Sequence, residues 1–353
     1  MGSLRFFLAL SVIFAHAGGV WSGFGLGNGR LAVQTFYMIS GFYMSLVWSE
    51  KYSAQPNPIR TFYISRALRI YPLYFIVLAI STFMALYLWK TTPQFPLLNP
   101  VENPLDLASL LWVYLTQITL VGMETPIFYG LHNYWISPVA WSLGLELTFY
   151  ALVPFLVTRI RLMVWIFIFS IVGRYGAYLL QGWQTDPAYQ LIWAYRFFPF
   201  EIALFLAGVF AHRTLTRLSP KFLSLIALPE IFLSMMFAMI GALCYFSIFY
   251  PRLNEATYWC YYAMTFAGII VLFHNTKNSK HDSHIGDLSY PMYILHLPVI
   301  WFLIYVVGAA ESDNVIYFTV PITILISIVF SKLQILVDRY RHSLVKAITP
   351  QPR

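Results

Sequence analysis

The chain has 353 residues, of which 59% are hydrophobic and only 10% are charged, whereas a soluble globular protein carries about 25% charged residues. Apolar stretches of about 20 residues recur from one end to the other, which excludes a soluble enzyme and predicts an all-α polytopic membrane protein. The net charge of +8 indicates no nucleic-acid partner, because most of the basic residues lie in loops on one side of the membrane, as in other bilayer-spanning proteins.

The apolar stretches predict ten membrane spans that form one transmembrane domain over residues 1–337, followed by a short basic cytoplasmic tail at 338–353. Glycines cluster in a turn after the first span, at 23–29, and prolines in a loop at 90–107. Pro229 lies within the seventh span and predicts a kink there. In chain order the spans are 3–19, 31–48, 71–89, 139–158, 162–180, 195–211, 222–249, 258–273, 292–307 and 316–336.

A further apolar stretch, 108–122, is short for a crossing, and we interpret it as interfacial or re-entrant. Both termini are then cytoplasmic, and all but five of the 22 lysines and arginines lie on the cytoplasmic side, as the positive-inside rule predicts. This orientation suits a multi-pass membrane protein with both termini in the cytoplasm. The exceptions are Arg30, Lys90, Arg174, Arg196 and Arg252.

The first span carries Arg5 near its start and His16 deep inside it. Eleven residues of helix place them on one face, about 16 Å apart along the axis. An ionisable residue inside a membrane is costly unless it faces protein or water, so we predict that His16 is a catalytic base. A histidine that merely hydrogen-bonds between helices is the alternative. Glu146 in the fourth span lies at a similar predicted depth and would orient His16, unless the two only form a packing ion pair.

Arg66 and Arg69 precede the third span with a spacing of three residues, which places both guanidinium groups on one face of a helical turn. Such a pair suits phosphate binding. Simple anchoring at the cytoplasmic surface explains it equally well. If Arg5 points to the same place, three cations converge on one cytoplasmic mouth.

Charged and aromatic side chains of the outer half are candidates for an acceptor site. Arg174, Arg196 and Glu201 would shape it, unless they only pair with one another, and Trp141 with Ser142 precedes Glu146, although such aromatic residues also mark the membrane interface. His296 would approach the donor from below, but a packing role is the stronger expectation.

The two cysteines, Cys244 and Cys260, are expected to be free thiols, although a disulfide is conceivable. No zinc-ligand spacing is present.

Five motifs in order resemble the acyltransferase-3 family of bacterial membrane acyltransferases, over essentially the whole chain. One departure is Arg30-Leu31-Ala32-Val33, where such families often have Gly-Val at the entry to the second span. The motifs are Arg5-x10-His16, Phe36 with Ser40-Gly41-Phe42, Arg66-x-x-Arg69 before Ile70-Tyr71-Pro72, Trp141-Ser142-Leu143-x-x-Glu146-x-x-Phe149-Tyr150, and Ser289-Tyr290-x-x-Tyr293-x-x-His296-x-Pro298.

The resemblance implies ten transmembrane helices in a bacterial cytoplasmic (inner) membrane. It also implies O-acylation, usually acetylation, of a carbohydrate such as O-antigen, lipopolysaccharide or exopolysaccharide. Acetyl-CoA or another acyl-CoA would be a donor substrate from the cytoplasm, with no bound cofactor. Ser40, Trp141 and Ser142 would then contact substrate. His16 would act as a direct base or as an acyl-histidine relay. A transporter or flippase of a lipid-linked sugar is the rival interpretation, but internal repeats typical of transporters are not found.

Overall fold

The computed structural model describes residues 1–17, 28–92, 106–180, 193, 195–249, 255–308 and 315–348, and within these ranges the chain forms helices and turns without a strand. Most of the predicted glycine-rich turn and of the proline-rich loop lies outside the described residues. Contacts divide the chain into two compact units, Met1–Glu50 with Leu204–His296 and Ala309–Ser331, and Lys51–Ala203 with Leu297–Gly308 and Lys332–Arg353.

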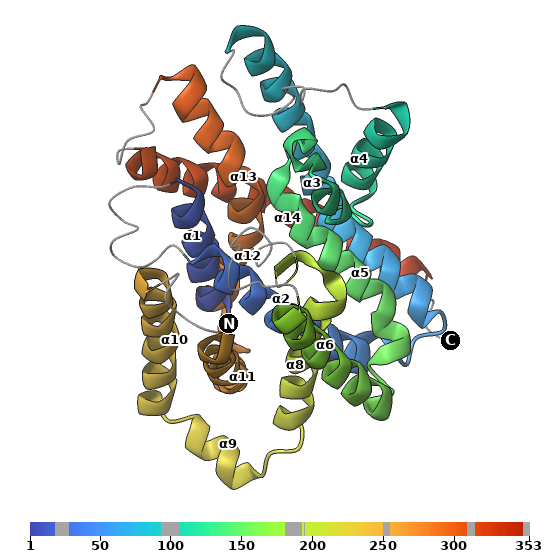
Figure 1. The fold of residues 1–353 in the computed structure, drawn as a ribbon. Helices are drawn as coiled ribbons and strands as arrows, with labels where there is room; N and C mark the ends of the chain where they lie inside the picture. Colours follow the sequence, from blue (N-terminus) through green and yellow to red (C-terminus); the bar gives the residue numbers. More distant parts are fainter. Residues whose placement is uncertain are drawn as a thin grey trace. The chain divides into compact units, whose positions relative to one another are not determined.

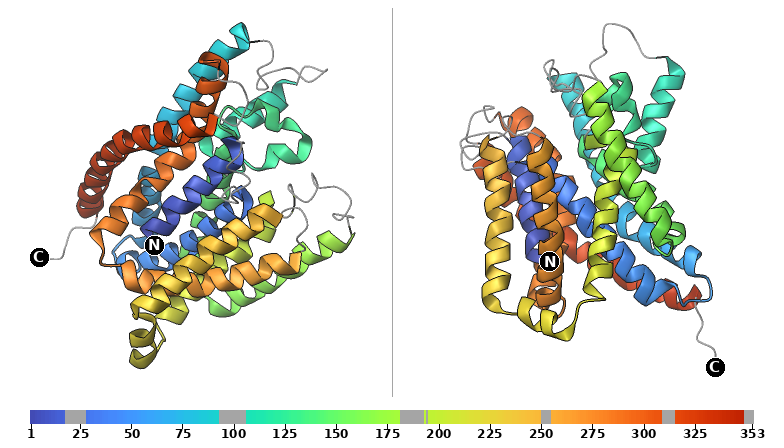
Figure 2. Two further views of the ribbon diagram at one scale, coloured as in Figure 1. Left: turned by 90° about the vertical axis from the view of Figure 1, so that its left-hand side faces the viewer. Right: turned by 60° about the horizontal axis from the view of Figure 1, so that its bottom comes forward.

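The first unit contains the helix that carries His16 and the helices that pack on it (Figure 1). In Figure 2 α10 and α11 run side by side. The helices of this unit are α1 (Gly2–Ala17), α2 (Gly29–Val47), most of α8 (Phe198–Leu215), α9 (Pro220–Ile226), α10 (Pro229–Phe249), α11 (Glu255–Thr276), α12 (Lys280–Asp287), the first part of α13 (Ser289–Trp301) and the first half of α14 (Val315–Ile348).

The second unit is built on the long helix α3 (Pro58–Thr91). Three short 3₁₀ turns connect α4 (Leu107–Thr119) to α5 (Trp141–Leu156), and α6 (Ile160–Leu180) follows. The end of α13 and the second half of α14 complete this unit, and α14 continues through the predicted tail as far as Ile348.

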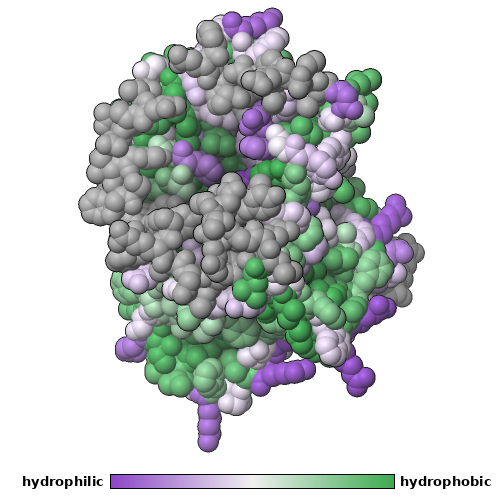
Figure 3. All heavy atoms as spheres, viewed as in Figure 1, coloured by the Kyte–Doolittle hydropathy of each residue, from purple (hydrophilic) through white to green (hydrophobic). Residues whose placement is uncertain are grey.

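Eight helical segments in the described residues are long and apolar enough to cross a membrane, and α1 and α4 are shorter apolar helices. In the most apolar 18 residues of each segment, 72% of the residues are buried in the segment with α2, but only 17% are buried in those of α6, α10 and α14. Large apolar side chains such as Phe83, Phe169 and Leu325 are exposed, and hydrophobic residues cover much of the drawn surface (Figure 3). Such a surface suits lipid, and the predicted polytopic membrane protein is confirmed.

Two of the predicted spans differ from the helices in the structure. Helix α3 begins at Pro58, 13 residues before the predicted start of the third span at 71, so Arg66 and Arg69 lie inside this helix, in agreement with the helical turn predicted for them. At 34 residues this helix is about 51 Å long, longer than a hydrocarbon core of about 30 Å, so hydropathy located only its apolar part. The predicted seventh span is two helices, because Pro229 begins α10 rather than kinking one helix.

Helices α2 and α8 approach closely at two glycines. A Cβ atom added to Gly41 would lie 1.9 Å from the carbonyl oxygen of Phe205, and one added to Gly208 would lie 1.8 Å from that of Met38. Small residues allow such backbone approach in membrane proteins. The Ser40-Gly41 motif therefore has a packing role for its glycine.

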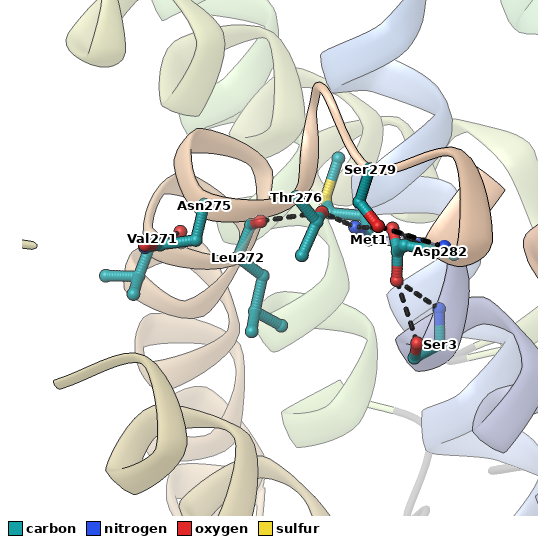
Figure 4. Close-up of polar contacts among 9 residues, drawn as sticks. Met1, Ser3, Val271, Leu272, Asn275, Thr276, Ser279 and Asp282 are labelled. Atoms are coloured by element: carbon teal, nitrogen blue, oxygen red, sulfur yellow. Dashed lines mark hydrogen bonds and ion pairs between the residues drawn. The ribbon is translucent and has the colours of Figure 1, made fainter. Parts of the chain in front are cut away.

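The first turn of α1 is fixed by Asp282 of α12 (Figure 4). The Asp282 carboxylate accepts hydrogen bonds from the backbone N–H groups of Gly2, at 2.6 Å, and Ser3, at 2.8 Å, and from the Ser3 hydroxyl. The amino group of Met1 donates to Asp282 and to the Thr276 hydroxyl. Because the first N–H groups of a helix have no partner inside it, this carboxylate both caps α1 and holds it against α12.

Candidate functional site

His16 lies at the last turn of α1 and contacts His296 of α13. Nε2 of His296 is 3.2 Å from Nδ1 of His16, which is also 2.9 Å from the carbonyl oxygen of Val12. His296 is fully buried, whereas His16 is exposed. Ala9, Ile13 and Met292 form an apolar cluster that holds the two helices together. His16 is therefore an accessible imidazole whose ring is held from one side by a buried one.

Arg5 lies in the same helix and unit as His16, so the predicted spacing on one face of a continuous helix is confirmed. The Tyr43 hydroxyl of α2 is within electrostatic range of Arg5, Asp282 and Asp287. Arg5 lies in the first half of α1, at the end of the helix away from His16. Ser40, on α2 of this unit, is buried.

In the second unit, Arg69 forms an ion pair with Asp338 of α14, with 2.8 Å between Nη1 and Oδ2. Arg341 pairs with the other oxygen of this carboxylate at 3.2 Å and lies within electrostatic range of Arg66 and Arg69. Arg66 donates to the Ser65 hydroxyl at 3.3 Å. Three guanidinium groups and one carboxylate thus share one region. Arg341 belongs to none of the five motifs, because it lies 272 positions beyond Arg69.

Glu146 accepts a hydrogen bond from the Tyr150 hydroxyl at 2.5 Å, one turn further along α5. Ser142 donates to the carbonyl of Val139 at 3.2 Å and is buried. Glu146 belongs to the second unit and His16 to the first, and their predicted pairing stays a prediction.

The guanidinium of Arg196 lies over aromatic rings in the second unit, 4.9 Å from the ring centroid of Trp141 and 5.9 Å from those of Trp135 and Tyr195. Gln117 of α4 accepts from the backbone N–H of Ile136 at 2.6 Å and so fixes the segment that carries Trp135. The structure therefore brings the predicted Trp141 and Arg196 together and adds two aromatic residues.

Arg174 of α6 and Glu201 of α8 form a buried ion pair with 3.1 Å between Nη1 and Oε1. Their side chains are only 3% and 0% exposed. The mutual pairing that we weighed as an alternative is therefore present, and direct contact with substrate stays a prediction for both residues.

Glu124, which sequence reasoning missed, is a buried carboxyl group between α4 and α5. Its Oε2 atom has no hydrogen-bond partner in the part of the chain that the structure describes, and it lies 3.2 Å from the position of a Cβ atom added to Gly144. Burial raises the pKa of Glu124 to about 7. A lone glutamate in a loop without a recognisable motif gives no signal of burial, so only the structure identifies it.

The cysteines agree with the sequence expectation, since Cys244 and Cys260 are both free.

The sequence matches the acyltransferase-3 family, whose description is an acyltransferase domain, over residues 2–332. The chain belongs to this family. That membership confirms the resemblance drawn from the five motifs and makes the protein a multi-pass membrane acyltransferase by family. No solved structure matches this acyltransferase-3 chain.

Among curated proteins, this acyltransferase-3 chain is similar to O-acetyltransferase OatA from three Staphylococcus aureus strains, NCTC 8325 / PS 47, COL and MRSA252. Each is 26% identical over 162 residues, which make up 45% of this chain and 24% of the relative. The match therefore spans about a quarter of the length of these relatives.

Proposed function

We propose that the protein moves an acyl group, most simply acetyl, from cytoplasmic acyl-CoA to a hydroxyl group of a carbohydrate at the membrane, such as O-antigen, exopolysaccharide or another surface glycan. The observation that carries the proposal is the exposed His16 ring, anchored through Nδ1, in a chain of an acyltransferase family. The similarity to OatA, an O-acetyltransferase, supports acetyl as the group transferred.

Donor binding falls to the arginines. Arg66 and Arg69 would bind the phosphates of acyl-CoA, because guanidinium groups bind phosphate oxygens in bidentate geometry. Arg341 adds positive charge to the same region, and Asp338 holds Arg69 in place while no phosphate is bound. Arg5 would line the route of the donor toward His16.

The transfer itself needs a base. His16 accepts the proton of the sugar hydroxyl, the oxygen attacks the thioester carbonyl carbon, and the C–S bond breaks. The proton then passes from the His16 imidazolium to the departing thiolate, so the products are the sugar ester and the free thiol. Glu146 would orient His16 and stabilise its charged form.

The acceptor is expected to meet the aromatic residues near Arg196. Flat rings such as Trp141 suit the apolar faces of sugar rings, and Ser40 and Ser142 are the predicted hydroxyl contacts. Arg174 and Glu201 would shape this region as an ion pair.

The test is acetyl incorporation by the purified full-length protein in nanodiscs, with radiolabelled acetyl-CoA, together with mass spectrometry of surface glycans from cells with and without the gene. His16→Ala should abolish incorporation while the protein stays folded. The matched control is His281→Ala, at an exposed position of α12. Wild-type acetylation by His16→Ala would refute the assignment, and absence of acetyl-CoA binding by the wild-type protein would favour a transporter of lipid-linked sugar.

A further inference from the structure

The two histidines of the first unit form a chain of donors and acceptors with one direction. Nδ1 of His296 lies 2.7 Å from the carbonyl oxygen of Tyr293. A carbonyl oxygen only accepts, so Nδ1 carries a proton and donates it. The His296 side chain is fully buried, where an imidazolium charge would be expensive. The neutral ring has a single N–H, which leaves a lone pair on Nε2.

The lone pair on Nε2 of His296 and the carbonyl oxygen of Val12 together determine the tautomer of His16. Nδ1 of His16 lies 3.2 Å from that atom and 2.9 Å from the carbonyl oxygen of Val12. Both of these atoms are acceptors, so Nδ1 of His16 carries the proton and is shared between them. In the neutral His16 ring the lone pair then resides on Nε2.

We propose that His296 is a positioning residue that keeps His16 in the Nδ1–H tautomer, so that Nε2 is the nitrogen that takes the hydroxyl proton; this catalytic reading rests on the proposed function. The carbonyl of Val12 accepts the backbone N–H four residues on in the α1 ladder and has a second lone pair for Nδ1, so Val12 and His296 favour this tautomer together. His296 is an acceptor outside that helix and fixes the plane of the ring, with 5.0 Å between the ring centroids.

The same contact with His296 also stabilises the charged form of His16. When Nε2 takes a proton, both ring nitrogens become donors, and the existing hydrogen bond from Nδ1 to His296 becomes charge-assisted. No second proton transfer is needed, since His296 keeps its own proton on Nδ1, from which it donates to the Tyr293 carbonyl. The cap that Asp282 provides at the start of α1 and the apolar cluster around Met292 hold the helices so that this contact persists.

A spectroscopic test needs no substrate. The full-length protein, labelled with [15N]histidine and placed in nanodiscs at pH 8.5, where an ordinary histidine is neutral, is studied by NMR of the ring nitrogens. His16→Gln assigns the His16 signals. We expect a protonated Nδ1 and an unprotonated Nε2 at His16. An Nε2–H tautomer at His16 in the wild-type protein overturns the proposal, whether or not the His296 variants fold.

Two variants of His296 separate positioning from packing. His296→Gln keeps an acceptor oxygen near the place of Nε2, whereas His296→Phe keeps an aromatic ring and removes the acceptor. We expect His296→Gln to retain the Nδ1–H tautomer and His296→Phe to give a mixture of both. An unchanged His16 tautomer in folded His296→Phe overturns the proposal.

Kinetics complete the test. His296→Phe should lower kcat for acetyl transfer about tenfold while KM for acetyl-CoA stays within about twofold, and His296→Gln should recover most of the loss, as expected for one hydrogen bond of about 1.4 kcal/mol in the transition state. Equal kcat values for His296→Phe and the wild-type protein contradict the catalytic reading. If no acyl transfer is found in the wild-type protein, the proposed function fails while the tautomer measurement still decides the assignment.

Discussion

Arg174 and Glu201 join α6 to α8 through a buried ion pair, with 3.1 Å between Nη1 and Oε1. Close by, the Ser170 hydroxyl donates to the carbonyl of Phe200 at 3.0 Å and accepts from the backbone N–H of Ala203 at 3.3 Å. This end of α8 is therefore fixed to α6 by polar contacts where both side chains of the ion pair are out of solvent.

We first predict that Glu201→Gln destabilises the protein by about 3 kcal/mol, because removal of one charge from a buried pair leaves the other poorly compensated. The double variant Arg174→Met with Glu201→Gln should lose less than the sum of the two single variants. The measurement is thermal unfolding in detergent, as a double-mutant cycle. Strictly additive losses of stability would contradict direct coupling of the two side chains and would favour the prediction that both contact substrate.

The second prediction concerns the contact of α2 with α8. Gly41→Ala should cost about 3 kcal/mol or more, because the new Cβ atom would lie 1.9 Å from the Phe205 carbonyl oxygen and two packed helix backbones cannot separate cheaply. Gly241→Ala in α10 is the matched control, because none of the residues that the structure describes lies within 4 Å of its new Cβ atom. There we expect a gain of up to about 1 kcal/mol from helix propensity. Similar unfolding temperatures for both variants would refute the close approach.

The helices were predictable because a run of apolar residues is a local property, whether the helix is as exposed as α6 or as buried as α2. The short helix at 107–119 was located for the same reason. The start of α3 could not be predicted in this way, because the residues from Pro58 onward that begin the helix lie outside the apolar stretch.

Contacts between distant side chains were harder to predict than the positions of the helices in the sequence. His16 and His296 are 280 positions apart, and both stood out as histidines in apolar spans, but nothing local indicates that their rings touch. The burial of Glu124 and the position of Asp338 between Arg69 and Arg341 likewise depend on how distant helices pack. Residue type and spacing identified candidate groups, whereas tautomer and ion pairing required the fold.

The third prediction uses the Asp338 carboxylate, which competes with an anionic donor for Arg69. Asp338→Asn keeps the shape but removes the charge, so KM for acetyl-CoA should fall about fivefold, since a partly exposed ion pair is worth up to about 1 kcal/mol. Arg69→Ala should raise KM, and both effects should shrink at high salt. The control is Glu230→Gln at an exposed position of α10. Unchanged KM values in both variants would leave the arginines as membrane anchors.

The last prediction concerns pH and Glu124. Burial raises the pKa of its carboxyl group from 4.5 to about 7 in the folded protein, so between these values the folded protein binds more protons than the unfolded chain. Stability therefore falls as the pH rises through this interval. The full cost above pH 7 is about 3 kcal/mol, from about 1.4 kcal/mol per unit of pKa.

Glu124→Gln removes the titration and keeps the shape of the side chain. We expect its unfolding temperature to exceed that of the wild-type protein clearly at pH 8.5 and much less at pH 5, because only the wild-type protein must hold a buried carboxylate at high pH. Glu230→Gln, which changes an exposed carboxylate, should show no such growth of the difference with pH. If the difference in unfolding temperature between Glu124→Gln and the wild-type protein is constant from pH 5 to pH 8.5, Glu124 ionises at its ordinary pKa. The conclusion that Glu124 is a buried neutral carboxyl group next to Gly144 is then wrong.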